Sequence, residues 1–578
     1  MNVGARSFVR AALWAAVACV TAGGGFSLAQ EKASGGAKGK DEWGRLEEVV
    51  GRVLREGEVP GAAVALVRGG RVVWHKGFGV KNARTKEPVD EATVFEAASL
   101  SKPVFAYAVL KLVERGKLDL DAPLAKHLPT PVVENDERLK LVTARMVLSH
   151  RTGFPNWRPR GQPLKIHFAP GERFSYSGEG YVYLQKVVEQ LTGEPLDAFV
   201  RRTVFAPLGM NSSSYVWRDE YESAKAHAHD EAGEVAGRNK PPEANAAASL
   251  QTTAQDYARF VAAVMRGEGL KGATAREMLR AQVKVDERCR VCVNSEGAPR
   301  PSQSVAWGLG WGLQRTADGE TFWHWGDNGN TKAYVVASKQ KRLGLVFFAN
   351  GANGLSVVHE IVGEVFGTQQ PALAWLDYEP YDSPARLLLR QVLTKGTSAL
   401  ADYRDAKNGA LTEAQVNRLG YRLLARKKTK EAIEVFKMNV ERFPASANAY
   451  DSLGEAYMKA GEKELAAANY RKAQELDPKN SKAAILKRLE TKVGEDILKA
   501  YEGEYEAPFG VLTVRREGAR LFGEVAGTPR EELLPESETQ FFAAGPNMTI
   551  VFVKSEAGEV THMLLRGRGD EIRAKKIK

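Results

Sequence analysis

Residues 95–114 read FEAASLSKPVFAYAVLKLVE, and they contain the most informative chemical pattern of the chain. From Ser99 to Glu114 the apolar residues recur at helical spacing, which predicts a helix that opens with Ser99. A helix N-terminus offers a free backbone N–H and a favourable dipole for an oxyanion. Lys102 lies one turn further along the same face.

Burial would disfavour the ammonium form of Lys102 and leave an amine that can take the proton of the Ser99 hydroxyl. These residues are therefore candidates for a nucleophile and its base. The alternative is an N-cap serine followed by a surface lysine.

The same S-x-x-K pattern occurs a second time, at Ser338–Lys341. This copy lies in YVVASKQKRLGLVFFAN, residues 334–350, which reads as a hairpin with a charged turn. Context therefore favours Ser99, because Ser99 opens a largely apolar helix and Ser338 lies at a charged hairpin turn.

Strand patterns lie on both sides of this helix in the sequence. Residues 59–79, VPGAAVALVRGGRVVWHKGFG, read as two strands joined at Gly69 and Gly70. Together with the hairpin at 334–350 they predict one antiparallel sheet made of N- and C-terminal pieces, with a helical insertion between them. This α/β (α+β) domain is expected to span residues 43–367.

Six motifs, two of them within the stretches quoted above, follow one another in a known order. They are VPGAAVALV at 59–67, FEAASLSKP at 95–103, VLSHRTGFPNW at 147–157, FAPGERFSYSGEGY at 168–181, PLGMNSSS at 207–214 and ASLQTTAQDYARF at 248–260. In this order they resemble the serine β-lactamase and penicillin-binding-protein superfamily, nearest its class C, D-aminopeptidase and esterase branch. The family's Tyr-x-Asn position corresponds to Tyr176-Ser177-Gly178, and its Lys-Thr-Gly position to His324-Trp325-Gly326.

The resemblance implies a role for each matching residue. Ser99 would attack a carbonyl and form an acyl-enzyme, and Lys102 would take its proton; which residue is the acylation base is disputed across the superfamily. Tyr176 would shuttle protons to the leaving group and from the deacylating water. The alternative for Tyr176 is a phenol that only packs under the helix.

The strand that ends at the Lys-Thr-Gly position would complete the substrate site. Gly326 would lie on this strand, and the backbone N–H groups of Ser99 and Asp327 would form the oxyanion hole. His324 would replace the family's lysine with a weaker, pH-dependent positive charge. Its alternative is a core histidine between two tryptophans.

Two residues depart from the family pattern. Gly178 replaces an Asn whose amide binds substrate in the family, and Trp325 replaces a small Thr. The expected function is therefore that of an exported bacterial serine hydrolase that cleaves an ester or amide, esterase-like or D-peptidase-like, without a metal or organic cofactor. The alternatives are a class C-like β-lactamase and a catalytically weak sensor of cell-wall fragments that binds a protein partner.

The chain changes character after residue 367. Residues 368–411 are expected to be a helical linker, and residues 412–492 repeat with a period of 34. The matched positions are Leu419-Gly420-Tyr421 with Leu453-Gly454-Glu455, Ala432 with Ala466, Phe436 with Tyr470, and Pro444 with Pro478. Small residues where paired helices touch and a closing proline resemble tetratricopeptide repeats, which could hold a protein partner.

Residues 493–578 alternate apolar and polar residues between turns, which predicts a small antiparallel β domain.

The N-terminus and the composition indicate where the chain works. Residues 1–29 combine arginines, a short apolar core and a small-x-small end, as in a secretory signal peptide, and residues 30–42 read as a flexible linker. We therefore expect a periplasmic or secreted protein, with a lipoprotein anchored through Cys19 as the less favoured alternative.

The composition excludes a polytopic membrane protein, since 43% of the residues are hydrophobic and 26% are charged. A net charge of +11, interspersed along 578 residues, gives no reason to expect nucleic-acid binding.

Two small clusters could in principle bind a metal. Cys289 and Cys292 form a lone C-x-x-C, which is half of a zinc site; a local disulfide and free thiols are both better explanations. His227 and His229 form an isolated H-x-H, for which a polar loop is the better explanation.

Overall fold

The structure is a computed structural model that describes residues 43–578 except 296, 405–410, 480–482, 544, 546, 568 and 569. The expected signal peptide (1–29) and linker (30–42) lie outside the described residues. Within the described part of the chain, no helix is both long and apolar enough to cross a membrane.

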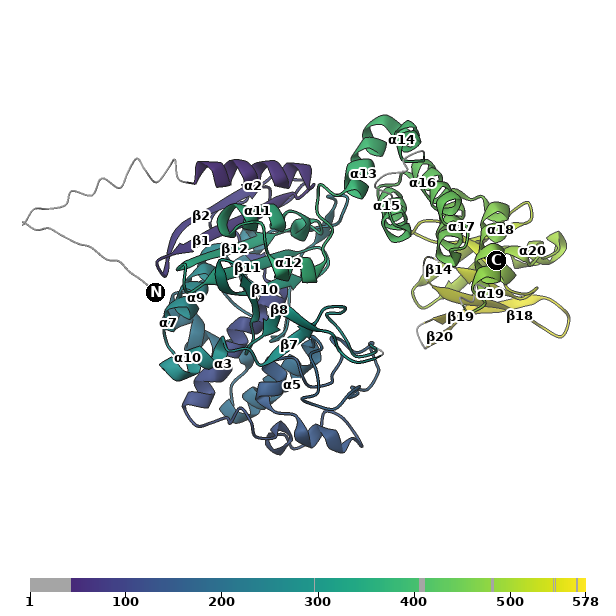
Figure 1. The fold of residues 1–578 in the computed structure, drawn as a ribbon. Coiled ribbons are helices and arrows are strands. Elements are labelled where there is room, and N and C mark those ends of the chain that lie inside the picture. Colours follow the sequence, from purple (N-terminus) through teal and green to yellow (C-terminus); the bar gives the residue numbers. More distant parts are fainter. Residues whose placement is uncertain are drawn as a thin grey trace, which may run out of the picture. The chain divides into compact units, whose positions relative to one another are not determined.

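An eight-stranded antiparallel sheet forms the centre of the first domain (Figure 1). Its strands, in spatial order, are β2 (Arg71–Gly79), β1 (Gly61–Arg68), β12 (Leu343–Ala349), β11 (Lys332–Ser338), β10 (Gly319–Asp327), β9 (Gly312–Thr316), β8 (Pro301–Trp307) and β7 (Val283–Asp286). Because β1 lies between β2 and β12, segments from both ends of the domain share one sheet. This confirms the topology expected from the sequence.

Strand β1 is buried on both faces, which explains its continuous apolar sequence. Ala63, Ala65 and Val67 join the core cluster that includes helix α9 (Ala254–Arg266), while the intervening Val64 and Leu66 point to the other face and are fully buried there. The turn to β2 uses Gly69 and Gly70, whose φ angles of 61° and 77° lie in the left-handed region that favours glycine.

The helical insertion lies between β2 and β7 in the sequence. Its helices are α3 (Ser101–Glu114), α4 (Ala144–Leu148), α5 (Gly178–Thr192), α6 (Leu196–Val200), α7 (Ala206–Leu208), α8 (Tyr221–Ala224), α9 and α10 (Gly272–Met278). It also contains two small sheets, β3 (Phe95–Glu96) with β6 (Gln251–Thr252), and β4 (Ala228–His229) with β5 (Val235–Gly237). Helix α2 (Gly44–Glu56) precedes the sheet, and α11 (Val358–Phe366) and α12 (Pro371–Leu376) follow it. Helix α11 contacts β12, and α12 contacts β8 and β9.

The helical region after the first domain contains the predicted repeats. It comprises α13 (Pro384–Lys395), α14 (Ala401–Arg404), α15 (Glu413–Ala425), α16 (Thr429–Arg442), α17 (Ala447–Ala460), α18 (Lys463–Leu476) and α19 (Ala483–Glu490). A Cβ atom on Gly420 would lie 2.4 Å from the Phe436 ring, and one on Gly454 would lie 2.7 Å from the Tyr470 ring. The period of 34 therefore marks the close contact between the two helices of each repeat.

The C-terminal β domain is a closed antiparallel barrel. Its strands are β13 (Gly503–Ala507), β14 (Gly510–Glu517), β15 (Arg520–Val525), β16 (Glu531–Pro535), β17 (Gln540–Ala543), β18 (Met548–Lys554), β19 (Val560–Gly567) and β20 (Asp570–Lys576). Pairing of Tyr505 with Lys576 closes the barrel. Tyr501 of the preceding helix α20 (Glu495–Tyr501) stacks on Phe552, with ring centroids 4.0 Å apart. The sequence predicted an antiparallel β domain, and the structure adds its closure.

Candidate active site

The candidate nucleophile lies on a strained turn between β3 and α3. Ala98 adopts a φ angle of 49°, in the left-handed region that non-glycine residues rarely occupy. Ser99 follows in a single 3₁₀ turn (Ala98–Leu100), so α3 begins two residues later than the sequence predicted. The Ser99 side chain is half-buried, whereas both of its neighbours in the chain are fully buried. The turn thus leaves the Ser99 hydroxyl partly accessible, while the residues on either side of it belong to the buried core.

The Lys102 amine lies beside the Ser99 hydroxyl. Its Nζ atom is 3.0 Å from Ser99 Oγ and 2.8 Å from the backbone carbonyl oxygen of Ala247. The side chain is fully buried, and burial holds the pKa of Lys102 well below its ordinary value. A neutral amine at this distance can accept the hydroxyl proton, which fits a general base.

Tyr176 comes from the segment that leads into α5. Its N–H donates to the Arg290 carbonyl oxygen at 2.9 Å, and its ring packs on Trp325 and His150 with centroids 4.6 and 4.2 Å apart. The Tyr176 hydroxyl is buried and has no hydrogen-bond partner among the described residues. Burial raises its pKa, and the nearby Ser99 side chain opposes this rise. The phenol therefore stays protonated and is free to exchange a proton near the nucleophile.

His324 is a fully buried ring on β10. Its Nδ1–H donates to the Trp325 carbonyl oxygen at 2.7 Å, and its Nε2 has no partner among the described residues. Burial, followed by the neighbouring Lys102, lowers the pKa of His324 to about 3. The ring is therefore neutral near neutral pH, and burial removes the pH-dependent positive charge that the sequence led us to expect there.

The end of β10 packs tightly against the nucleophile turn. A Cβ atom on Gly326 would lie 2.5 Å from the Ala97 carbonyl oxygen and 3.2 Å from the Ala98 Cβ. Only glycine permits this approach, which brings Asp327 and the turn before Ser99 together. The Asp327 carboxylate does not point into open solvent, because Lys332 and Tyr378 both bind it.

Trp157 lies against Gly178, the position of the family's asparagine. A Cβ atom on Gly178 would lie 2.7 Å from the Trp157 ring and 3.0 Å from the Asn156 carbonyl oxygen. The indole is 47% exposed, so it forms an accessible apolar wall. Sequence comparison with the family showed what is missing at position 178 but not what fills the space.

Other residues singled out in the sequence are not among the candidate catalytic groups, although the Cys289–Cys292 loop contacts the Tyr176 segment. Lys341 of the second S-x-x-K pairs with Asp318 at 3.0 Å. Both ring nitrogens of His229 bind backbone groups at 3.0 Å, which leaves neither for a metal. Cys289 and Cys292 form a disulfide with a Cα–Cα distance of 5.6 Å.

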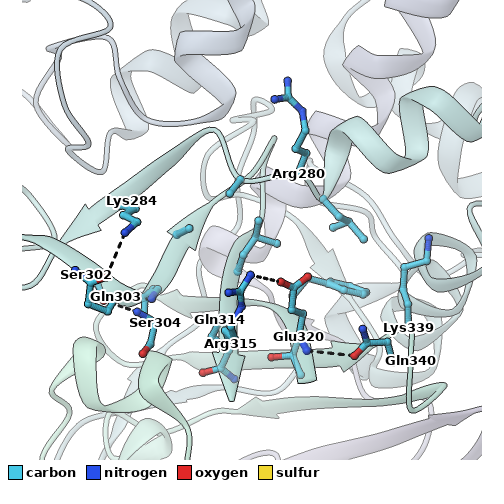
Figure 2. Close-up of a pocket in the computed structure, with 17 residues that line it drawn as sticks. Arg280, Lys284, Ser302, Gln303, Ser304, Gln314, Arg315, Glu320, Lys339 and Gln340 are labelled. Carbon is cyan, nitrogen blue, oxygen red and sulfur yellow. Dashed lines mark hydrogen bonds and ion pairs between the residues drawn. The ribbon is translucent and has the colours of Figure 1, made fainter. Parts of the chain in front are cut away.

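A cavity of about 670 Å³ lies over β8, β9 and β10 (Figure 2). Arg280, Arg315, Glu320 and Lys339 are among the residues that line it, and no candidate site residue is. Its size alone does not make it the reaction site.

Comparison with known proteins identifies the family of the chain. A sequence profile described as Beta-lactamase matches residues 46–361, more than half of the chain. The chain belongs to the beta-lactamase family. A second profile, described as Tetratricopeptide repeat, matches residues 447–480.

Individual known proteins share part of this sequence. Esterase EstB of Burkholderia gladioli is 33% identical over 202 residues, which cover 30% of this chain and 51% of EstB. Protein flp of Staphylococcus aureus (strain N315) is 25% identical over 192 residues, which cover 30% of this chain and 39% of flp. The chain thus spans about half or less of the length of these curated relatives. Among solved structures, the octameric penicillin-binding protein homologue from Pyrococcus abyssi aligns with a TM-score of 0.46 and 20% identity, over 92% of this chain and 99% of that one.

Sequence reasoning missed Lys332 and Tyr378, which hold Asp327. Lys332 faces Asp327 across the β10–β11 hairpin and could have been found from the register of that hairpin. Tyr378 lies in the segment expected to be a linker, and nothing in its local sequence places it near β10.

Proposed function

We propose that this protein is a serine hydrolase that cleaves an ester or amide through an acyl-enzyme on Ser99. The observation that carries the proposal is the fully buried Lys102 amine 3.0 Å from Ser99 Oγ. Burial holds the pKa of Lys102 well below its ordinary value, and no carboxylate among the described residues pairs with it to oppose this. In its neutral form such an amine can take the proton of the neighbouring serine hydroxyl.

The reaction runs in two halves. Ser99 Oγ attacks the substrate carbonyl carbon as its proton passes to Lys102 Nζ, and the backbone N–H groups of Ser99 and Asp327 bind the oxyanion. The C–O or C–N bond then breaks, and the leaving group takes a proton from the Lys102–Tyr176 pair. Water attacks the acyl-enzyme and gives a proton to the same pair, which passes it to Ser99 Oγ as the C–O bond to Ser99 breaks and the acid leaves. The reaction is balanced without a cofactor.

Esters are the substrate class that the site suits best. The amide donor of the family is absent at Gly178, and the Trp157 ring occupies the space beside it. The neutral His324 offers no positive charge to a substrate carboxylate. An activated ester needs only the nucleophile and the oxyanion hole. The 33% identity to a protein named as an esterase points the same way.

The compartment and the partner of the enzyme follow from other parts of the chain. The Cys289–Cys292 disulfide supports export to an oxidising compartment, either the periplasm or the medium, as expected from residues 1–29. Tetratricopeptide repeats commonly stack helices into a binding surface, so we assign residues 412–492 a role in holding a protein partner.

Turnover of p-nitrophenyl butyrate and of nitrocefin at pH 7.5 tests the proposal. We expect the ester to have the higher kcat/KM in the wild type. Lys102→Ala should lower ester kcat by a factor of about 10² to 10⁴, the usual contribution of a general base. Ser99→Ala should abolish turnover, and Ser338→Ala, which alters the other S-x-x-K, should leave it intact. Equal loss in the two serine variants would refute the assignment of Ser99, and faster nitrocefin turnover would favour a β-lactamase.

A further inference from the structure

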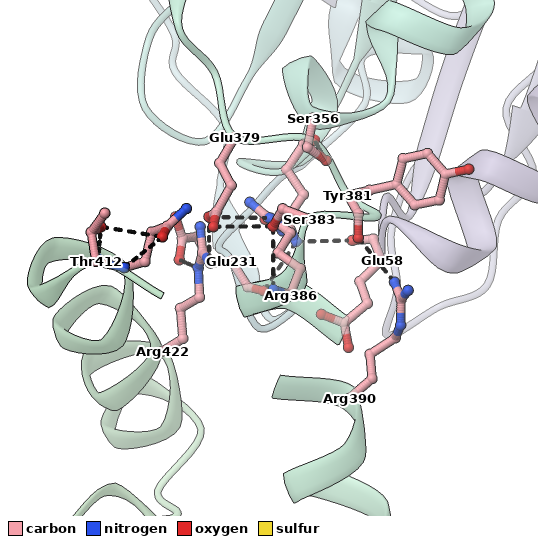
Figure 3. A network of polar contacts seen from close by, with 12 residues as sticks. Glu58, Glu231, Ser356, Glu379, Tyr381, Ser383, Arg386, Arg390, Thr412 and Arg422 are labelled. Carbon is pink, nitrogen blue, oxygen red and sulfur yellow. Dashed lines mark hydrogen bonds and ion pairs between the residues drawn. The ribbon is translucent and has the colours of Figure 1, made fainter. Parts of the chain in front are cut away.

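The segment between α12 and α13 contacts the first tetratricopeptide helix through a buried ion pair (Figure 3). Arg422 of α15 donates to the Glu379 carboxylate at 2.6 Å and lies 3.2 Å from the Glu231 carboxylate. The Arg422 and Glu379 side chains are only 7% and 11% exposed. Glu379 also accepts from Ser383 at 3.1 Å and lies 3.7 Å from Arg386, so the pair is part of a network. Loss of Arg422 would remove the shortest contact of a largely buried carboxylate, which is costly.

The residue just before Glu379 contacts the candidate active site instead. The Tyr378 hydroxyl donates to Asp327 Oδ2 at 2.6 Å. Burial and the Asp327 carboxylate raise the pKa of Tyr378, so its hydroxyl remains a donor. Asp327 Oδ1 accepts from the Gly329 N–H at 2.9 Å and from Lys332. Both oxygens of this carboxylate are therefore fixed.

Asp327 has little room to move without disturbing the nucleophile turn. The preceding residue, Gly326, lies so close to the Ala97 carbonyl oxygen that a Cβ atom there would be 2.5 Å away. A shift of Asp327 would move its backbone N–H relative to Ser99. A displacement of about 1 Å at a reacting group can cost a factor of about 10² in rate.

We infer that Tyr378 is a positioning residue for the oxyanion hole, and that docking of the tetratricopeptide module through Arg422 holds it in place. The inference rests on the proposed function in one respect, because it takes the Asp327 N–H to be an oxyanion donor. Successive residues, Tyr378 and Glu379, contact the active-site strand and the repeat helix respectively. A partner that displaces α15 would thereby lower the activity of the hydrolase domain.

The kinetic test uses the full chain and p-nitrophenyl butyrate. Tyr378→Phe, which keeps the ring, should lower kcat about 10-fold and change KM less than about 2-fold, because the substrate still binds. Arg422→Gln should lower kcat about 5-fold. The double variant should lose no more than Tyr378→Phe alone, because Arg422 acts through Tyr378. Arg418→Gln is the matched control, since Arg418 lies exposed one turn earlier on the same helix.

Hydrogen exchange of the backbone amides of residues 326–332 gives a second readout that needs no activity. Exchange should be several-fold faster in Tyr378→Phe and in Arg422→Gln than in the wild type, and unchanged in Arg418→Gln. If the wild type hydrolyses no ester, the proposed function fails, and the exchange data still decide whether Arg422 and β10 are coupled. Unchanged exchange in Arg422→Gln, or kcat losses that multiply in the double variant, would overturn the inference.

Discussion

Trp157 and Gly178 are the residues that we expect to set the choice between ester and lactam. An asparagine at position 178 would place its Cβ 2.7 Å from the indole, so the two side chains compete for one space. Gly178→Asn alone should therefore leave nitrocefin turnover low. Combined with Trp157→Ala, it should raise nitrocefin turnover relative to ester turnover about 10-fold. This ratio corresponds to the free energy that about one hydrogen bond contributes. Trp157→Ala alone should give no such gain; an equal gain there would mean that Trp157 acts only as a steric block.

Lys102 should determine how activity depends on pH. The amine must be neutral to act as a base, so kcat/KM should fall as pH drops below the pKa of Lys102, which burial holds well below its ordinary value. Tyr176, whose pKa is raised, should remain protonated into the alkaline range. His324, with a pKa of about 3, should add no inflection near pH 6.5. A pH–rate profile from pH 5 to 10 measures this, and activity that is lost as pH rises through about 6.5 would show that a protonated histidine is required.

At the residue scale, the sequence predicted the Ser99–Lys102 pair because the two residues are only three positions apart, which brings them together in the 3₁₀ turn and the first turn of α3. It did not predict the state of His324, since the pKa of a histidine depends on burial by residues from distant parts of the chain. Tyr378 was missed for the same reason: it lies 51 residues beyond Asp327 in sequence.

The loop closed by Cys289 and Cys292 is the element that holds the Tyr176 segment. The Arg290 carbonyl accepts the Tyr176 N–H at 2.9 Å, and the Cys292 N–H donates to Ser175 Oγ at 2.8 Å. Replacing both cysteines by serine should lower ester kcat several-fold, because the loop then holds Tyr176 less firmly. The free energy of unfolding should fall by no more than about 2 kcal/mol, since the closed loop is short. Unchanged kcat in a variant that mass spectrometry shows to lack the disulfide would contradict this role.

Among the elements, the sheet strands and the repeat helices were predictable because each carries a recognisable pattern in its own sequence. Strand β1 has a continuous apolar run, and α15 to α18 repeat small and bulky residues every 34 positions. Closure of the C-terminal barrel was not predictable, since alternation of apolar and polar residues is the same in open and closed sheets. Pairing of β13 with β20 decides it, and these strands lie at opposite ends of the domain.

At the scale of the whole molecule, the hydrolase domain depends on residues after Gly367. Gln370 Oε1 accepts from Gln314 Nε2 at 2.7 Å, and Trp375 packs against Trp307, with ring centroids 6.5 Å apart. A chain truncated after Gly367 should therefore be less stable than one truncated after Asp382, by about 1–3 kcal/mol for the lost, partly buried tryptophan alone. Thermal unfolding of the two truncated chains tests this, and equal Tm values would show that α12 does not stabilise the domain.

Covalent labelling of the nucleophile tests the central claim most directly. The folded wild-type protein is treated with a fluorophosphonate, its intact mass is measured, and the adduct is mapped by peptide mass spectrometry. We expect one adduct per chain, on Ser99, the same adduct in Ser338→Ala and none in Ser99→Ala. An adduct on another serine, or no adduct on the folded wild-type protein, would contradict the assignment of Ser99 as the nucleophile of a serine hydrolase.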